Sequence, residues 1–80
     1  MDATETTVRD LLKRHGRLGV DIAELKRTDD LYSAGLTSHA SVDMMLALED
    51  DFGVEFPERL LKRRTFESIA NLCDAVVELA

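Results

Sequence analysis

A pair of hydroxyl residues, Thr37 and Ser38, follows Gly35 and comes directly before a helical pattern of apolar residues. The N-terminus of a helix has unpaired backbone N–H groups and the positive end of the helix dipole, and it stabilises an exposed phosphate by about 0.3–1 kcal/mol. Ser38 could therefore carry a phosphodiester. Either hydroxyl could instead serve only as a helix N-cap, which is the commoner role for such a residue.

The other residue types that can do chemistry show no suitable spacing. His15, His39 and the single Cys73 are far apart in the sequence and have no metal-ligand pattern. Asp29-Asp30 lacks the alternating carboxylates and central glycine of a calcium loop. Cys73 lies within an apolar stripe, which favours a buried, unreactive thiol. No metal site is expected.

Helical periodicity predicts a first helix over residues 3–15 and then a long connecting loop over residues 17–37. Asp2 and Glu5 stand in capping-box positions, Gly16 is placed to turn the chain out of the helix, and His15 lies at the favourable C-terminal end. The loop is long for a compact domain, which indicates that it packs on the helices or carries a site. Its isolated apolar anchors are Ile22, Leu25, Leu31 and Leu36.

A second helix is predicted over residues 38–52, ended by Gly53 as a left-handed cap. Val42 and Leu46 fall beside its core stripe, with Asp43 and Asp50 around them. This arrangement fits either a wide core face or a partner-binding surface, and periodicity does not decide between them. The predicted core stripe consists of Met44, Met45, Leu48 and Phe52.

Pro57 can open a short third helix over residues 58–62, and Thr65 is expected to cap the last helix. Phe52 and Leu72 are both predicted to be buried. The sequence shows no strand pattern and no internal repeat. The predicted fold class is therefore all-α, a small four-helix bundle with three longer helices and a short third one. It is expected to form a single domain over residues 1–80. The apolar stripe of the last helix comprises Ile69, Leu72, Cys73, Val76 and Val77.

Size and charge narrow the possible functions. A chain of 80 residues has little room for a deep enzyme pocket, and a net charge of −6 argues against nucleic-acid binding. Ten of the sixteen acidic residues but only two of the ten basic ones lie in residues 21–58, which would attract a basic partner or simply keep the protein soluble. The polar N-terminus lacks a signal-peptide pattern and no apolar run could span a bilayer, so the expected location is the cytoplasm, without membrane contact.

A series of short motifs follows Ser38 without gaps. Gly35-Leu36-Thr37-Ser38 is followed by Val42-Asp43, by Ala47-Leu48-Glu49-Asp50-Asp51-Phe52 and by Glu55-Phe56-Pro57. This array resembles the acyl carrier protein family and has the spacing of that family. The resemblance implies that Ser38 carries a covalent 4'-phosphopantetheine, attached by a separate phosphopantetheinyl transferase. The protein would then be no enzyme itself, but a monomeric shuttle that carries a thioester-bound group from a loading ligase to an acceptor enzyme.

Two residues beside the serine depart from the family pattern. Thr37 replaces the usual Asp before the serine and His39 the usual Leu after it, so partner preferences are expected to differ. The segment after Pro57 is also basic where fatty-acid carriers are commonly acidic, through Arg59, Lys62, Arg63 and Arg64. The residues assigned to partner binding are Thr37, His39, Val42, Asp43, Leu46 and Arg63.

The second half of the chain is similar to a narrower subgroup of the family. These are the carriers that are charged with amino acids by ligases related to aminoacyl-tRNA synthetases. An aminoacyl cargo is therefore expected, with fatty-acid, polyketide and nonribosomal-peptide carriers as alternatives. A non-catalytic helical interaction module, with Ser38 only a helix cap, is the alternative from another class. The subgroup resemblance depends on Phe56-Pro57, Leu60-Leu61, Arg63, Phe66 and Ser68-Ile69.

Overall fold

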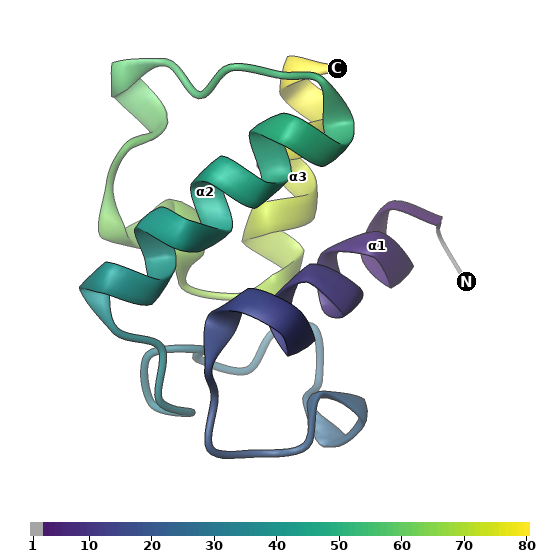
Figure 1. The fold of residues 1–80 in the computed structure, drawn as a ribbon, viewed down its shortest axis with the longest axis vertical. Coiled ribbons are helices and arrows are strands. Elements are labelled where there is room, and N and C mark those ends of the chain that lie inside the picture. Colours follow the sequence, from purple (N-terminus) through teal and green to yellow (C-terminus); the bar gives the residue numbers. More distant parts are fainter. Residues whose placement is uncertain (1–2) are drawn as a thin grey trace.

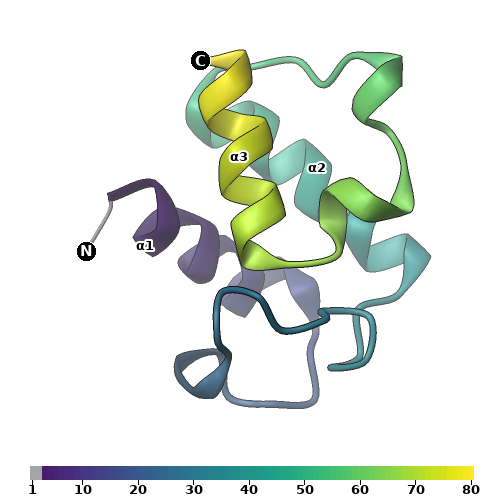
Figure 2. The same cartoon turned by 180° about the vertical axis from the view of Figure 1, so that it is seen from behind.

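The computed structural model describes residues 3–80, whose three α-helices and shorter helical turns share one hydrophobic core (Figure 1). Helix α1 spans Ala3–Leu11, α2 spans Ser38–Phe52 and α3 spans Ile69–Leu79. Helix α1 packs against α3 and α2, and the segment 17–37 covers the end of the bundle away from the C-terminus (Figure 2). Every helix in this part of the chain falls short of the length and hydropathy of a membrane span.

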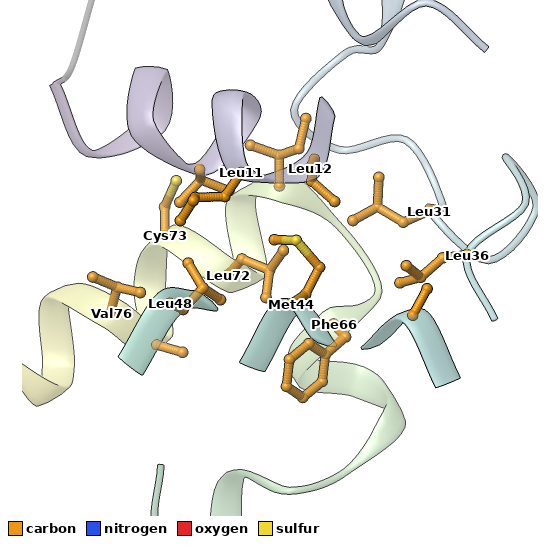
Figure 3. Packing of buried hydrophobic residues seen from close by; sticks show 14 of the residues in the cluster. Leu11, Leu12, Leu31, Leu36, Met44, Leu48, Phe66, Leu72, Cys73 and Val76 are labelled. Atoms are coloured by element: carbon orange, nitrogen blue, oxygen red, sulfur yellow. The ribbon is translucent and has the colours of Figure 1, made fainter. Parts of the chain in front are cut away.

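The core is mostly aliphatic, with Phe56 and Phe66 as its aromatic members, and it includes side chains from all three helices (Figure 3). Burying an aliphatic side chain completely contributes about 1.5–3 kcal/mol each, so these residues hold the bundle together. Leu31 and Leu36 of the connecting segment join the core, whereas Ile22 and Leu25 are only partly buried against it. The largest fully buried side chains are Leu12, Leu31, Met44, Leu48, Ile69, Leu72, Val8 and Val76.

Helix α1 continues as one turn of π-helix, Leu12–Gly16, so the helical structure reaches the predicted end. The residue in the left-handed conformation is Arg17, with φ 54°, rather than Gly16. Gly16 is instead buried, and a Cβ at this position would lie 3.2 Å from Leu12 Cδ2. The predicted capping box lies outside the described residues at its Asp2 end.

Helix α2 has the predicted boundaries. Gly53, with φ 66°, ends it in the left-handed region and donates its N–H to the Glu49 carbonyl. Met44 and Leu48 are fully buried as predicted, but Met45 and Phe52 are only partly buried. The prediction of a buried Phe52 is therefore wrong, because this last residue of the helix lies at the edge of the core.

The short third helix is replaced by two turns of 3₁₀-helix, Glu58–Leu60 and Arg63–Phe66. Thr65 is buried within the second turn, so its predicted role as the cap of the last helix is wrong. The backbone becomes extended only at Ser68, which caps α3 by accepting the Asn71 N–H at 3.1 Å.

Helix α3 buries Leu72 and Cys73 as predicted, but Val77 is 60% exposed. Val77 lies eight residues after Ile69 and one after Val76, which places it roughly 80° and 100° around the helix from these two buried residues. Including it in the buried stripe was therefore an error.

Candidate functional site

Ser38 occupies the first turn of α2 with an exposed side chain. Thr37 caps the helix, because its Oγ1 accepts the Ala40 N–H at 3.0 Å. Ser38 contributes only its backbone carbonyl, which accepts a hydrogen bond from Ser41 Oγ at 2.7 Å. The two hydroxyls therefore have separate roles, and that of Ser38 remains available for modification.

A tight turn directly precedes Thr37 and Ser38 in the chain. Leu31 and Leu36 are buried at its two ends, and Leu36 N donates to the Leu31 carbonyl at 2.9 Å. Gly35 has φ 114°, a conformation that side-chain-bearing residues rarely adopt. Asp30 fixes the start of the turn by accepting from Tyr32 N at 2.9 Å and Ser33 Oγ at 3.0 Å. The bond from Ser33, followed by the backbone bonds, lowers the pKa of Asp30.

The connecting segment is also bound to α1 and α3. Arg9 Nη1 donates to the carbonyls of Ile22 and Leu25 at 3.0 and 2.9 Å. Glu5 accepts from Arg9 at 3.1 Å and from Arg27 at 2.9 Å, and these bonds, that from Arg27 first, lower the pKa of Glu5. The carbonyl of Arg27 in turn accepts the Ala70 N–H at 2.8 Å. The loop before Ser38 is thus held on both sides by polar contacts.

An open groove of about 390 Å³ lies beside Ser38, between α2 and the residues after Leu60. We call it the Ser38 groove. Its lining is mostly apolar and includes two cations, Lys62 and Arg63. The groove is lined by Tyr32, Ser38, Ser41, Val42, Met45, Leu61, Lys62, Arg63 and Phe66.

Arg63 is held within this groove by Tyr32. The guanidinium carbon of Arg63 lies 3.8 Å from the centroid of the Tyr32 ring, in a cation–π contact. The Tyr32 hydroxyl points to the Arg63 carbonyl at 3.4 Å. Partial burial raises the pKa of Tyr32, so the phenol keeps its proton and donates it in this bond. Arg63 thus has a fixed position although it is exposed.

The other predicted partner residues lie along α2 and at its start. Asp43 is within ion-pair distance of Arg17, at 3.6 Å, and of His39 Nε2, at 3.7 Å. Leu46 is 54% exposed in a second cleft, which Asp43 and Arg17 also line. Val42 is exposed and belongs to the Ser38 groove. The predicted residues therefore fall into three groups, with Arg63 and Val42 in the groove, Asp43 and Leu46 in the second cleft, and Thr37 and His39 at the start of the helix.

Sequence reasoning missed Tyr32 and Arg17. Tyr32 meets a residue 31 positions away, and no local pattern marks such a contact. Arg17 follows the predicted end of the first helix, where its positive φ was not foreseen. A lone tyrosine near the serine and a basic residue after Gly16 were the available signals, and both are weak.

The site suits a covalent phosphopantetheine. The Ser38 hydroxyl is exposed, the helix cap is supplied by another residue, and two cations line the groove beside the serine. Lys62 and Arg63 would offset the negative charge of the phosphodiester, and the apolar lining would accommodate the pantetheine chain. When bound, this group supplies the thiol on which a thioester is formed.

A model of the family described as "Phosphopantetheine attachment site" matches residues 6–76. The chain therefore belongs to the family of small carrier proteins that hold their cargo on a covalent phosphopantetheine arm.

The relatives point to one branch of this family. An aminoacyl carrier protein from Agrobacterium fabrum is 43% identical over 70 residues, which is 88% of this chain and 84% of that relative. The crystal structure of an engineered glycine:[carrier protein] ligase from Bradyrhizobium japonicum, complexed with a carrier protein from Agrobacterium tumefaciens and ATP, contains a chain that matches with a TM-score of 0.91. This match has 39% identity and covers 95% of this chain and 99% of that chain. A solution structure of an A. tumefaciens protein matches with a TM-score of 0.73 and 40% identity, covering 92% and 89%.

Proposed function

We propose that this chain carries an aminoacyl group as a thioester on a phosphopantetheine attached to Ser38. The observation that carries the proposal is the division of roles at the start of α2, where Thr37 caps the helix and the Ser38 hydroxyl is exposed. A plain interaction module has no need of an exposed serine beside a cap that is already formed. The relative from A. fabrum and the ligase complexes favour an amino acid as cargo.

The chemistry requires three partner enzymes. A phosphopantetheinyl transferase uses coenzyme A and magnesium to modify Ser38, which supplies the nucleophilic oxygen. An amino acid:carrier protein ligase then loads the arm at the expense of ATP, and an acceptor enzyme removes the cargo. The carrier has no reaction of its own, and a tethered thioester raises the effective concentration of the cargo at each active site.

The partner surface in this proposal surrounds the start of α2. Two exposed apolar side chains, Val42 and Leu46, are the contacts that an enzyme would desolvate, and Asp43 gives a charged contact beside Leu46. Thr37, His39 and Arg63 would complete the surface beside the attachment serine. We further propose that residues 1–80 act as one monomeric domain in the cytoplasm.

Loading in vitro tests the cargo. The phosphopantetheine form is incubated with an amino acid, ATP and a ligase of the glycine:[carrier protein] type, and the intact mass is measured before and after hydroxylamine. One aminoacyl group should be added and then released by hydroxylamine, and Ser38→Ala should gain none. If fatty-acid synthase enzymes charge the modified protein as readily as their own carrier while no such ligase loads it, the aminoacyl proposal is wrong.

A further inference from the structure

We propose that Arg63, held on the Tyr32 ring, binds the phosphodiester of the arm and so keeps the resting arm along the Ser38 groove. The inference rests on the proposed attachment at Ser38. It assigns to Arg63 a role within the carrier itself, as a positioning residue for the prosthetic group, in addition to the contact with partner enzymes proposed above.

The first reason is location. Ser38 and Arg63 line the same open groove of about 390 Å³ on opposite sides, although they belong to α2 and to the turn Arg63–Phe66. A phosphate esterified to the Ser38 oxygen is one bond away from that side chain. It therefore lies at the groove that Arg63 and Lys62 also line.

The second reason is that the positive charge of Arg63 is not used in an ion pair within residues 3–80. The basic partners of the ion pairs in this part of the chain are Arg9, Arg14, Arg17, Arg27, His39 and Arg59. The nearby carboxylate of Asp30 already accepts hydrogen bonds from Tyr32 and Ser33. A planar guanidinium with free N–H groups is well suited to bind two phosphate oxygens at once.

The third reason is preorganisation. The contact with Tyr32, at 3.8 Å from the ring centroid, restricts the guanidinium before any ligand arrives. Less side-chain entropy is then lost when the phosphate binds. Beyond the phosphate, Met45, Leu61 and Phe66 offer an apolar surface to the pantetheine chain.

Nuclear magnetic resonance of the apo and phosphopantetheine forms tests this inference. Amide shifts of residues along the groove should change between the two forms, with contacts between pantetheine protons and the Met45 and Leu61 side chains. In Arg63→Gln we expect these shift changes to fall about twofold or more, the size expected when an exposed ion pair is lost. Arg63→Lys should keep part of the effect, because it retains the charge but not the planar guanidinium. High salt should reduce the shift changes in the wild type and have little effect in Arg63→Gln.

Arg64→Gln is the matched control, because it removes the same charge at the next residue. Arg64 lines a different cavity, together with Asn71 and Asp74. The shift changes between the apo and phosphopantetheine forms of Arg64→Gln should equal those of the wild type. Equal changes in Arg63→Gln and the wild type, or no pantetheine contacts in the groove at all, would overturn the inference. Intact mass recorded on the same samples separates this result from a failure of attachment, since an unmodified protein would contradict the proposed function and the present inference with it.

Discussion

At the scale of single residues, the start of α2 separates a structural hydroxyl from a functional one. Thr37 has an extended backbone and accepts the Ala40 N–H, whereas the Ser38 side chain is exposed. The sequence left open which of the two hydroxyls caps the helix. The structure assigns the cap to Thr37, and the two residues should therefore respond differently to substitution.

Ser38→Ala should leave the free energy of unfolding almost unchanged, because the helix keeps its cap and alanine is the best helix former. Thr37→Ala should lower it by about 0.5–2 kcal/mol. Urea denaturation of both variants beside the wild type measures the difference. A larger loss in Ser38→Ala than in Thr37→Ala would mean that the cap is misassigned.

A substitution of Leu46 allows the effects on stability and on partner docking to be compared in one variant. The Leu46 side chain is 54% exposed, so Leu46→Glu should lower the free energy of unfolding by less than about 0.5 kcal/mol while it weakens the docking of the loading ligase. The ligase KM and the denaturation midpoint are measured on the same variant. Val77→Glu, the same kind of change at a 60% exposed apolar position on α3, is the control and should alter neither. If Leu46→Glu unfolds the protein and leaves the KM of the folded fraction unchanged, Leu46 belongs to the core.

At the scale of the elements, the loop before Ser38 is held by α1. Glu5 binds both Arg9 and Arg27, and Arg9 also holds two carbonyls of the loop. These bonds lower the pKa of Glu5 below its ordinary value of 4.5. Because the folded pKa is the lower one, Glu5 stabilises the fold fully above that value, and this contribution is lost as the pH falls through the folded pKa.

We therefore expect Glu5→Gln to be less stable than the wild type at neutral pH. The difference should shrink as the pH falls below 4.5, since the wild-type carboxylate is then protonated too. Thermal melting over a pH series gives both curves, with Asp51→Gln as a control for a loss of negative charge elsewhere. A gap between the melting temperatures of Glu5→Gln and the wild type that stays constant with pH would contradict this account.

The core of α3 gives the clearest stability prediction. Leu72 is fully buried, so Leu72→Ala should lower the free energy of unfolding by about 2–5 kcal/mol. Val77→Ala, on the same helix but 60% exposed, should change it by less than about 0.5 kcal/mol. Denaturant titrations compare the two variants, and similar losses would show that the buried face of α3 is misplaced.

The elements that could be predicted from the sequence are those specified by local signals. The boundaries of α2 follow from the hydroxyl residues at its start and Gly53 at its end, and the buried positions Met44, Leu48 and Leu72 follow from helical periodicity. The structure of the segment 58–66 is harder to predict from the sequence, because isolated 3₁₀ turns are too short to show a periodic pattern. The contact between Tyr32 and Arg63 could not be foreseen, since only the tertiary fold brings the two together.

At the scale of the whole molecule, helix α2 contributes to two clefts of different character, and Ser38 lines one of them. The Ser38 groove has a mostly apolar lining with two cations, whereas the second cleft contains both acidic and basic side chains. The net charge of −6 would favour the approach of a basic partner surface. The cations of the Ser38 groove would repel such a surface on that side, so a partner must complement both signs.

Intact mass spectrometry after incubation with coenzyme A, magnesium and a phosphopantetheinyl transferase tests the central claim most directly. The wild type should gain one phosphopantetheine and no more. Ser38→Ala should gain none, while Ser41→Ala, which changes another serine of the same groove, should still be modified. An unmodified wild type, or a modified Ser38→Ala variant, would contradict the account of this chain as a carrier with its arm on Ser38.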